Sequence, residues 1–217
     1  MAKKIVSIVL KFIIVLSVAV GATISSWGRV SSLLFFTTQS NIWIAALCIV
    51  ELVIVFAKKP LASWMFTAKL IFTVSITLTG FVYVVMLAPF IESGAYTLDR
   101  TLLHVVVPIA AAVDFFLVDY PTQSNKLHTL LVTVPPSYYL AFAGIGFALN
   151  WDFMDGQNYP YYFLNWGSPA GAFRIVHESP YIGVVYYVLI LLGIVVGMGY
   201  MYVWLSSVIR KRSSKHN

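Results

Sequence analysis

The sequence predicts an all-α integral membrane protein with six transmembrane helices in a single domain spanning residues 1–217. Hydrophobic residues make up 60% of the chain and charged residues only 10%, whereas a soluble chain has about 25% charged residues. A helix needs roughly 20 apolar residues to cross a bilayer. The chain therefore has room for six spans with short loops, and this length excludes an additional soluble domain.

Six apolar runs bounded by charged residues, Pro or Gly define the expected spans. They fall at about 5–26, 40–57, 69–90, 102–119, 128–149 and 181–206. The first run follows two lysines, as in a signal peptide, but it continues past Gly21 without a cleavage site, so we interpret it as a span. In the fifth run, Pro135 and Pro136 are expected to kink the helix and widen the bundle at mid-depth.

The basic residues predict how the spans are oriented. Three of them, Arg29, Arg100 and Arg174, lie in segments on one side of the membrane, and Lys11 lies within a span. The other side carries ten: Lys3, Lys4, Lys58, Lys59, Lys69, Lys126, Arg210, Lys211, Arg212 and Lys215. Because basic loops remain in the cytoplasm, we expect both termini on the cytoplasmic side of the cell membrane. The spread of these charges over several loops argues against a nucleic-acid groove, despite a net charge of +6.

The longest connection, 150–180, is an aromatic outer loop between the fifth and sixth spans. Its central part, 158–171, is rich in Tyr, Phe and Trp and is interrupted by Pro and Gly. Tyr and Trp are favoured where a membrane meets water. The loop is therefore expected to lie in the interface or to fold over the outer mouth of the bundle.

Three charged residues, Lys11, Glu51 and Asp114, lie inside predicted spans. Each is six or seven residues from the cytoplasmic end of its span, which at 1.5 Å per residue places all three about 10 Å deep. Charges at depth are functional candidates because they are costly to bury in lipid. The two interpretations are a structural ion pair, with snorkelling of Lys11 as a variant, and a proton or ion relay.

A second polar group lies at the outer ends of the second and fourth spans. Thr37, Thr38, Asn41 and His104 share one depth, and Thr37 and Asn41, four residues apart, project from one helix face. In one interpretation these side chains cap helix ends and His104 is an interfacial histidine bonded to a carbonyl group. In the other they form a hydroxyl nucleophile with a histidine base. In the second case, backbone N–H groups at the start of the helix would stabilise an oxyanion.

Three stretches carry a family resemblance. Phe36-Thr-Thr-Gln-Ser-Asn41 resembles the F-T-x-Q-S-N signature of a bacterial family of six-span membrane proteins. His104-Val-Val-Val-Pro108, and Tyr161-Tyr-Phe-Leu-Asn165 continuing through Gly167 to Arg174 and Ile175, resemble the H-T-T-V-L-P and Y-P-F-L-E…G-P-G-A-R-I stretches of the androgen-induced membrane protein family. Members of that family are intramembrane threonine hydrolases that cleave fatty acid esters of hydroxy fatty acids.

The resemblance implies a lipid ester hydrolase with a threonine nucleophile and His104 as its base. The bacterial signature favours Thr37 and the animal spacing favours Thr38, so both are candidates. Ser40, Asn41, Tyr162 and Asn165 are candidates for binding the substrate or the oxyanion, although the animal pattern has an acid where Asn165 stands. The expected substrate is a fatty-acyl ester dissolved in the membrane, with no cofactor and no metal ion. The sequence does not separate hydrolysis from acyl transfer.

Two other functional classes remain open. In the first, Lys11, Glu51 and Asp114 line the path of a small-solute or proton-coupled transporter. In the second, the chain is a structural membrane protein, whose Gly193 and Gly197 form a Gly-x-x-x-Gly pair that allows close packing in a homodimer or within one chain.

Overall fold

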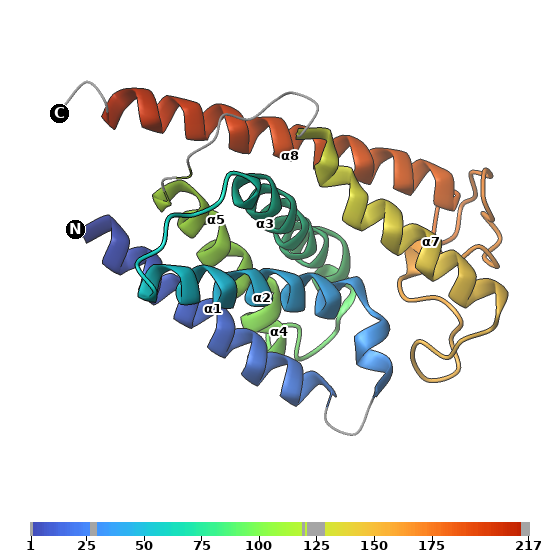
Figure 1. Cartoon of the computed structure of the whole chain (residues 1–217). Helices are drawn as coiled ribbons and strands as arrows, with labels where there is room; N and C mark the ends of the chain where they lie inside the picture. Colours follow the sequence, from blue (N-terminus) through green and yellow to red (C-terminus); the bar gives the residue numbers. More distant parts are fainter. Residues whose placement is uncertain (1, 27–29, 119, 121–128, 214–217) are drawn as a thin grey trace.

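The computed structural model of the chain describes residues 2–26, 30–118, 120 and 129–213 (Figure 1). The basic residues Arg29, Lys126 and Lys215, and the start of the fifth predicted span at residue 128, lie outside the described part. Among these residues, six helical stretches are long and apolar enough to cross a membrane: Ala2–Ser26, Phe36–Phe56, Trp64–Phe90, Leu98–Leu117, Leu131–Ala148 and Val184–Lys211. The predictions of an all-helical fold and of six apolar helices of spanning length are confirmed, and the chain is a multi-pass membrane protein.

Several of the spans are composite. The first two are the continuous helices α1 (Ala2–Ser26) and α2 (Phe36–Phe56), and the last is α8 (Val184–Ser213). The third is α3 (Trp64–Val82) followed by a π-helical turn, Tyr83–Leu87. The fourth span consists of α4 (Leu98–Thr101), a π-helical turn (Leu102–Val106) and α5 (Val107–Leu117). The fifth consists of a 3₁₀ turn (Leu131–Thr133) followed by α7 (Val134–Ala148).

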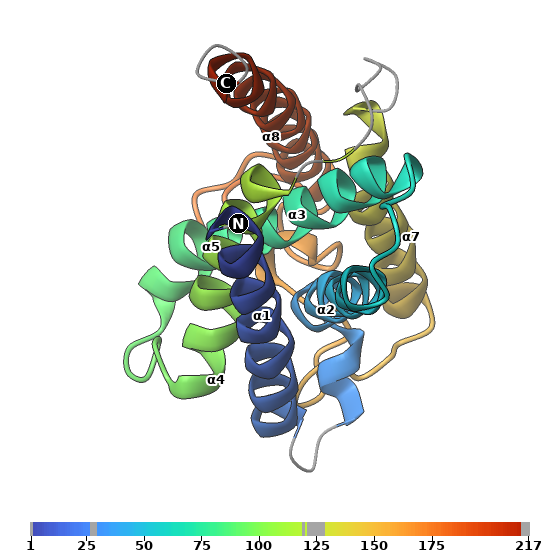
Figure 2. The same cartoon turned by 60° about the vertical axis from the view of Figure 1, so that its left-hand side comes forward.

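The helix α3 is the centre of the bundle. One side of α3 packs against α2 and α5, and α1 lies against both of these helices (Figure 2). Buried aliphatic side chains, among them Ile14, Ile44, Ile76 and Ala111, fill the space between these four helices. The helix α8 packs on the opposite side of α3 from α1 (Figures 1 and 2). This arrangement leaves a long apolar surface on the outer helices, as a lipid environment requires.

The two ends of the bundle differ in character. The helix α1 begins and α8 ends at the same end (Figure 1), where Lys58 and Lys59 also follow α2. We call this the basic end. The other end, which we call the loop end, contains the start of α2 and the long connection between α7 and α8 (Figure 1).

The long connection folds back onto the helices. Its residues Phe153, Phe163, Leu164 and Ala170 are buried. A Cβ atom at Gly183 would lie 2.3 Å from the carbonyl oxygen of Ala172, so only glycine fits where the connection returns to α8. Phe153 and Phe163 of the connection therefore form part of the protein core at the loop end.

Two sequence predictions about helix geometry are wrong. Pro135 and Pro136 lie in the first turn of α7, directly after the 3₁₀ turn Leu131–Thr133, so they stand near the start of the span Leu131–Ala148 and not at its mid-depth. The helix α3 begins at Trp64, before the predicted start at residue 69. As a result Lys69, which was assigned to the cytoplasmic flank, lies inside the helix and is fully buried.

Within the described part of the chain, the glycine pair in α8 makes no close helix contact. Cβ atoms added at Gly193 and Gly197 would meet no described atom within 4 Å, whereas one at Gly199 would contact Val132 and Thr129. The helix α8 is also the least buried of the six spans. Homodimer formation through this face stays a prediction.

Candidate functional site

The hydroxyl of Thr37 lies beside the imidazole of His104 at the loop end. Their Oγ1 and Nε2 atoms are 3.4 Å apart, although the residues are 67 positions apart in sequence. Thr37 is the second residue of α2, and His104 is in the π-helical turn Leu102–Val106. The start of α2 and the fourth span thus bring a hydroxyl and a ring nitrogen together, as the shared depth of these residues predicts.

The second ring nitrogen of His104 determines the role of the first. Nδ1 lies 2.9 Å from the carbonyl oxygen of Arg100. A carbonyl oxygen only accepts hydrogen bonds, so Nδ1 carries the proton and donates it. In the neutral ring Nε2 is then unprotonated and can accept the proton of the Thr37 hydroxyl. A backbone carbonyl here orients the imidazole, which in many hydrolases is the task of an acid.

Two π-helical turns position the imidazole. The ring of Tyr83 stacks on His104 with centroids 3.9 Å apart, and each residue lies in one of the two turns. Pro108 lacks the N–H that would bond the carbonyl of His104 in a regular helix. At the same place Gly80 lets α3 approach closely, because a Cβ there would lie 2.8 Å from the His104 carbonyl oxygen. Such π-helical turns are frequent at functional sites.

No side chain at the N-cap position caps the start of α2. The N-cap residue is Phe35, and no side chain accepts a hydrogen bond in the cap position. The alternative that Thr37, Thr38 or Asn41 caps this helix is therefore wrong. First-turn N–H groups remain directed towards the loop end, and that of Thr37 points to the hydroxyl oxygen of Tyr161 at 3.4 Å.

The other polar residues of this turn have different surroundings. Thr38 is buried, with 4% of its surface exposed. Of the two threonines, Thr37 is the one whose hydroxyl lies beside the His104 ring. Ser40 and Asn41 are fully buried. The Ser40 hydroxyl lies within hydrogen-bonding distance of Thr79 in α3, and the Asn41 amide donates to the carbonyl oxygens of Thr37 and Leu103. Ser40 and Asn41 thus hold α2 to the neighbouring spans and shape the turn that presents Thr37.

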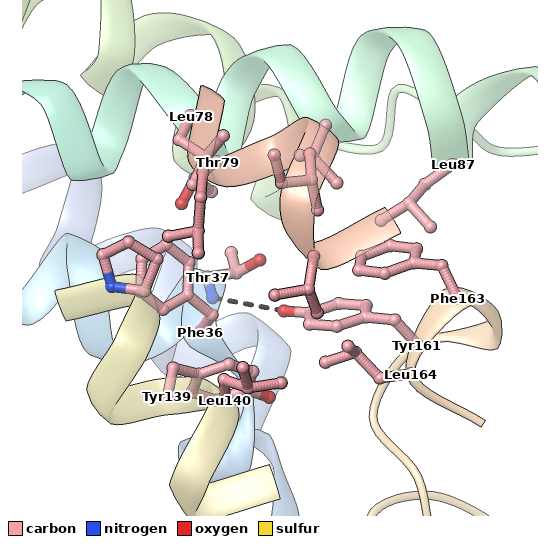
Figure 3. Close-up of a pocket in the computed structure, with 15 residues that line it drawn as sticks. Phe36, Thr37, Leu78, Thr79, Leu87, Tyr139, Leu140, Tyr161, Phe163 and Leu164 are labelled. Atoms are coloured by element: carbon pink, nitrogen blue, oxygen red, sulfur yellow. Dashed lines mark hydrogen bonds between the residues drawn. The ribbon is translucent and has the colours of Figure 1, made fainter. Parts of the chain in front are cut away.

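The long connection between α7 and α8 contributes Tyr161, a residue that the sequence analysis does not select. Tyr161 lies over the start of α2 with its hydroxyl beside Thr37 (Figure 3). Burial raises the pKa of this phenol, so it stays protonated and can donate a hydrogen bond at neutral pH. The tyrosine pair in the sequence signals an aromatic contact, but nothing in the pattern selects Tyr161 over Tyr162.

Of the two loop residues that the resemblance suggests, Tyr162 lines the cavity at His104 and Asn165 does not. Tyr162 packs edge-on against Phe90 and Tyr187 and lines the cavity beside His104. The side-chain oxygen of Asn165 accepts a hydrogen bond from the N–H of Gly167 at 3.0 Å. Asn165 therefore stabilises a local turn of the loop.

Two cavities meet at Thr37. One is a polar cavity of about 1070 Å³ at the loop end, and its lining includes His104, Arg100 and Asp99. The other is a narrow apolar pocket between α3, α7, α8 and the loop (Figure 3), lined among others by Leu140, Leu164 and Val188. Thr37, Tyr161 and Leu87 line both. An ester at Thr37 could therefore place its polar part in one cavity and an aliphatic chain in the other.

The intramembrane charges form a second cluster, nearer the basic end. Lys11 lies 2.8 Å from Asp114 and 3.3 Å from Glu51, which brings together the three charges that the sequence singled out. Lys69 completes the cluster at 3.0 Å from Glu51 and 2.6 Å from Asp114. We call Lys11, Lys69, Glu51 and Asp114 the ion quartet. Its two positive and two negative charges balance, and sequence reasoning missed Lys69 because the predicted helix began too late.

Neighbouring hydroxyl groups donate further hydrogen bonds to the two carboxylates of the ion quartet. Ser7 donates to Asp114, and the Tyr120 hydroxyl donates to Glu51. Burial, followed by the negative charge of Glu51, raises the pKa of Tyr120 well above its usual value. Cys48, Glu51 and Asp114 could offer metal ligands, but the ammonium group of Lys69 lies within 3.6 Å of an atom of each. This ammonium holds the place that a metal cation would take.

The comparisons with known proteins leave the chain without an assigned relative. No protein-family model, no curated protein and no solved structure matches it.

Proposed function

We propose that this protein is an intramembrane lipid ester hydrolase with Thr37 as nucleophile and His104 as general base. The observation that carries the proposal is the 3.4 Å contact between Thr37 Oγ1 and His104 Nε2, made with the tautomer that leaves Nε2 free to accept a proton. The resemblance of the Phe36–Asn41 and His104–Pro108 stretches to known signatures supports the same pair.

The reaction follows from the positions of these groups. His104 Nε2 accepts the hydroxyl proton while Thr37 Oγ1 attacks the ester carbonyl carbon. The imidazolium then donates that proton to the leaving alkoxide, which departs as an alcohol and leaves an acyl-threonine. Water attacks this second ester with His104 again as base, and a carboxylic acid is released. The sum is one ester and one water converted to one alcohol and one acid.

The oxyanion formed in each attack would be stabilised from two sides. First-turn N–H groups of α2 carry the positive end of the helix dipole. The Tyr161 hydroxyl oxygen accepts the N–H of Thr37, and its own proton would be donated to the oxyanion. A preorganised donor of this kind contributes about 10²- to 10³-fold to the rate of acyl transfer. This assigns Tyr161, rather than Ser40 or Asn41, as the side chain at the oxyanion.

The expected substrate is a fatty-acyl ester that reaches the site from the membrane. Its aliphatic chain would occupy the apolar pocket, whose lining residues include Leu140 and Leu164. The orientation predicted from the basic residues places this site in the outer leaflet of the cell membrane. An alcohol acceptor in place of water would make the same acyl-enzyme an acyltransferase.

A fluorophosphonate probe tests the proposal, because it forms a stable bond to an activated hydroxyl with loss of fluoride. We expect the purified protein to be labelled, and the labelling rate to fall by about 10²- to 10⁴-fold in Thr37→Ala and His104→Gln. Thr38→Ala, one residue away, is the matched control and keeps normal labelling. Equal labelling of all four proteins overturns the proposal, and loss in Thr38→Ala alone moves the nucleophile to that residue.

The transporter alternative rests on the ion quartet, because Lys11 and Glu51 line a cavity that reaches them from the basic end. It predicts solute or proton flux in proteoliposomes that is lost in Glu51→Gln or Asp114→Asn. Flux of that kind, in a protein that fluorophosphonate does not label, would favour transport over hydrolysis.

A further inference from the structure

A cavity at the basic end has a strongly positive lining. It has a volume of about 680 Å³ and lies between the start of α1, the end of α2 and the end of α5. Its charged residues are Lys3, Lys4, Lys11, Lys58, Lys59 and Glu51, and Ile8, Val55, Leu61 and Leu117 contribute apolar walls. The cavity thus combines positive charge at its mouth with apolar walls, and its lining includes the buried pair Lys11 and Glu51.

The positive field does not come from the ion quartet. Lys11 and Glu51 belong to that balanced group of charges. The net charge of the lining therefore comes from Lys3 and Lys4 in the first turn of α1 and from Lys58 and Lys59 after α2. The dipole of the 25-residue helix α1 adds positive potential at the same place.

The backbone at Lys58 also distinguishes this mouth. Lys58 has a φ of 55°, in the left-handed region that favours Gly or Asn. Glycine would adopt this backbone conformation with less strain than the lysine that is present. The fold holds this charged side chain at the rim of the cavity.

The surface beside the cavity is suited to acyl chains. Ile5, Val9 and Phe12 of α1 and Val53 and Phe56 of α2 are all more than 40% exposed. The ring centroids of Phe12 and Phe56 are 6.4 Å apart. The exposed apolar side chains of the two helices therefore form one continuous surface. Apolar side chains at this depth of a spanning helix face lipid.

We propose that the cavity binds the phosphate headgroup of an anionic phospholipid, with the acyl chains lying along the exposed faces of α1 and α2. The lysines supply the charge-assisted hydrogen bonds that a phosphate accepts, and basic pockets between spans are suited to anionic headgroups. This site lies at the opposite end of the bundle from Thr37 and does not depend on the hydrolase function.

The test compares two lipids with the full-length protein in a neutral detergent. Phosphatidylglycerol should raise the midpoint of thermal unfolding and stay bound in native mass spectrometry, and phosphatidylcholine with the same chains should do neither. The difference should shrink in high salt, because charge attraction is screened. Equal effects of the two lipids overturn the proposal.

Charge-removing variants locate the site. We expect Lys3→Gln/Lys4→Gln and Lys58→Gln/Lys59→Gln each to weaken binding of phosphatidylglycerol at least about tenfold. Arg210→Gln/Lys211→Gln removes the same charge from the same end, outside the cavity, and should bind normally. Two pairs are tested so that a folding defect in one leaves the other informative.

The remaining outcomes are equally decisive. Equal weakening in the Arg210/Lys211 control overturns the proposal, because it shows general attraction to the basic end. Full protection by inorganic phosphate alone overturns the lipid assignment, because a free anion then suffices. Fluorophosphonate labelling of Thr37 is expected to be unchanged in the lysine variants, so the two functional proposals fail or succeed independently.

Discussion

The imidazole of His104 stacks against the ring of Tyr83, with the two planes 25° apart. Tyr83 is itself held by a hydrogen bond from its hydroxyl to the carbonyl oxygen of Ala95. The stack and the Arg100 carbonyl together leave the imidazole few orientations other than the one that points Nε2 at Thr37. The proposed hydrolysis therefore depends on residues that do not touch the substrate.

Tyr83→Leu should slow the reaction of Thr37 while leaving the protein folded. Loss of an aromatic stack worth about 0.5–1.5 kcal/mol releases the imidazole, and we expect the fluorophosphonate labelling rate to fall up to about tenfold. Tyr83→Phe keeps the aromatic ring, removes only the hydrogen bond to the Ala95 carbonyl, and is the control with a rate expected closer to wild type. Equal rates in the two variants would show that the stack has no part in positioning His104.

Gly80→Ala should disturb the site through the backbone. The added Cβ would lie 2.8 Å from the carbonyl oxygen of His104, so α3 and the π-helical turn must separate. We expect the free energy of unfolding to fall by about 1–3 kcal/mol and labelling to be lost. Gly193→Ala, where a Cβ meets no described atom within 4 Å, should behave as wild type; a similar loss there would contradict the explanation.

Tyr161→Phe tests whether Tyr161, and not the adjacent Tyr162, donates a hydrogen bond in the reaction. Removing the phenol donor is expected to lower kcat for ester hydrolysis by about 10²- to 10³-fold with a smaller effect on KM, because the bond forms in the transition state. Tyr162→Phe, the adjacent change, should leave kcat near wild type. The reverse result would return the role to Tyr162.

Val188→Trp should shorten the acyl chain that the enzyme accepts. Val188 lines the apolar pocket, and the indole would fill space meant for the distal part of the chain. We expect kcat/KM to fall for long-chain esters and to persist for short ones. Leu189→Trp, on the 62% exposed neighbour, is the control, and an unchanged chain-length profile in Val188→Trp would place the chain elsewhere.

The ion quartet should behave as a unit in a double-mutant cycle. Asp114→Leu or Lys69→Met alone leaves an uncompensated buried charge, which costs about 3–5 kcal/mol. The double variant keeps the balanced Lys11–Glu51 pair, 3.3 Å apart, so its loss in the free energy of unfolding should be well below the sum. Additive losses would show that the two residues do not interact, and the exposed Glu92→Gln gives the background change of about 0.5 kcal/mol or less.

The predictions that differ from the structure concern where helices begin. The turn before Trp64 contains Pro60 and Ser63, which are ordinary helix-start residues, yet hydropathy alone predicts a start at residue 69. That difference of one turn moved a lysine from the membrane surface to the bundle interior. In the fifth span the apolar run begins several residues before the prolines, so the sequence predicts that they lie in the middle of the helix. In the structure they lie in the first turn of α7.

The sequence by itself determined the number of spans, their approximate limits, and the shared depth of Thr37 with His104 and of Lys11 with Glu51 and Asp114. These properties follow from apolar length and from distance along a helix, which composition and spacing record. Only the tertiary structure decided that Thr37 rather than Thr38 lies beside His104, that Tyr161 covers it, and that Lys69 balances the buried charges. Neighbouring residues on a helix point about 100° apart, so these contacts depend on helix rotation, π-helical turns and loop folding, which packing sets and local spacing does not encode.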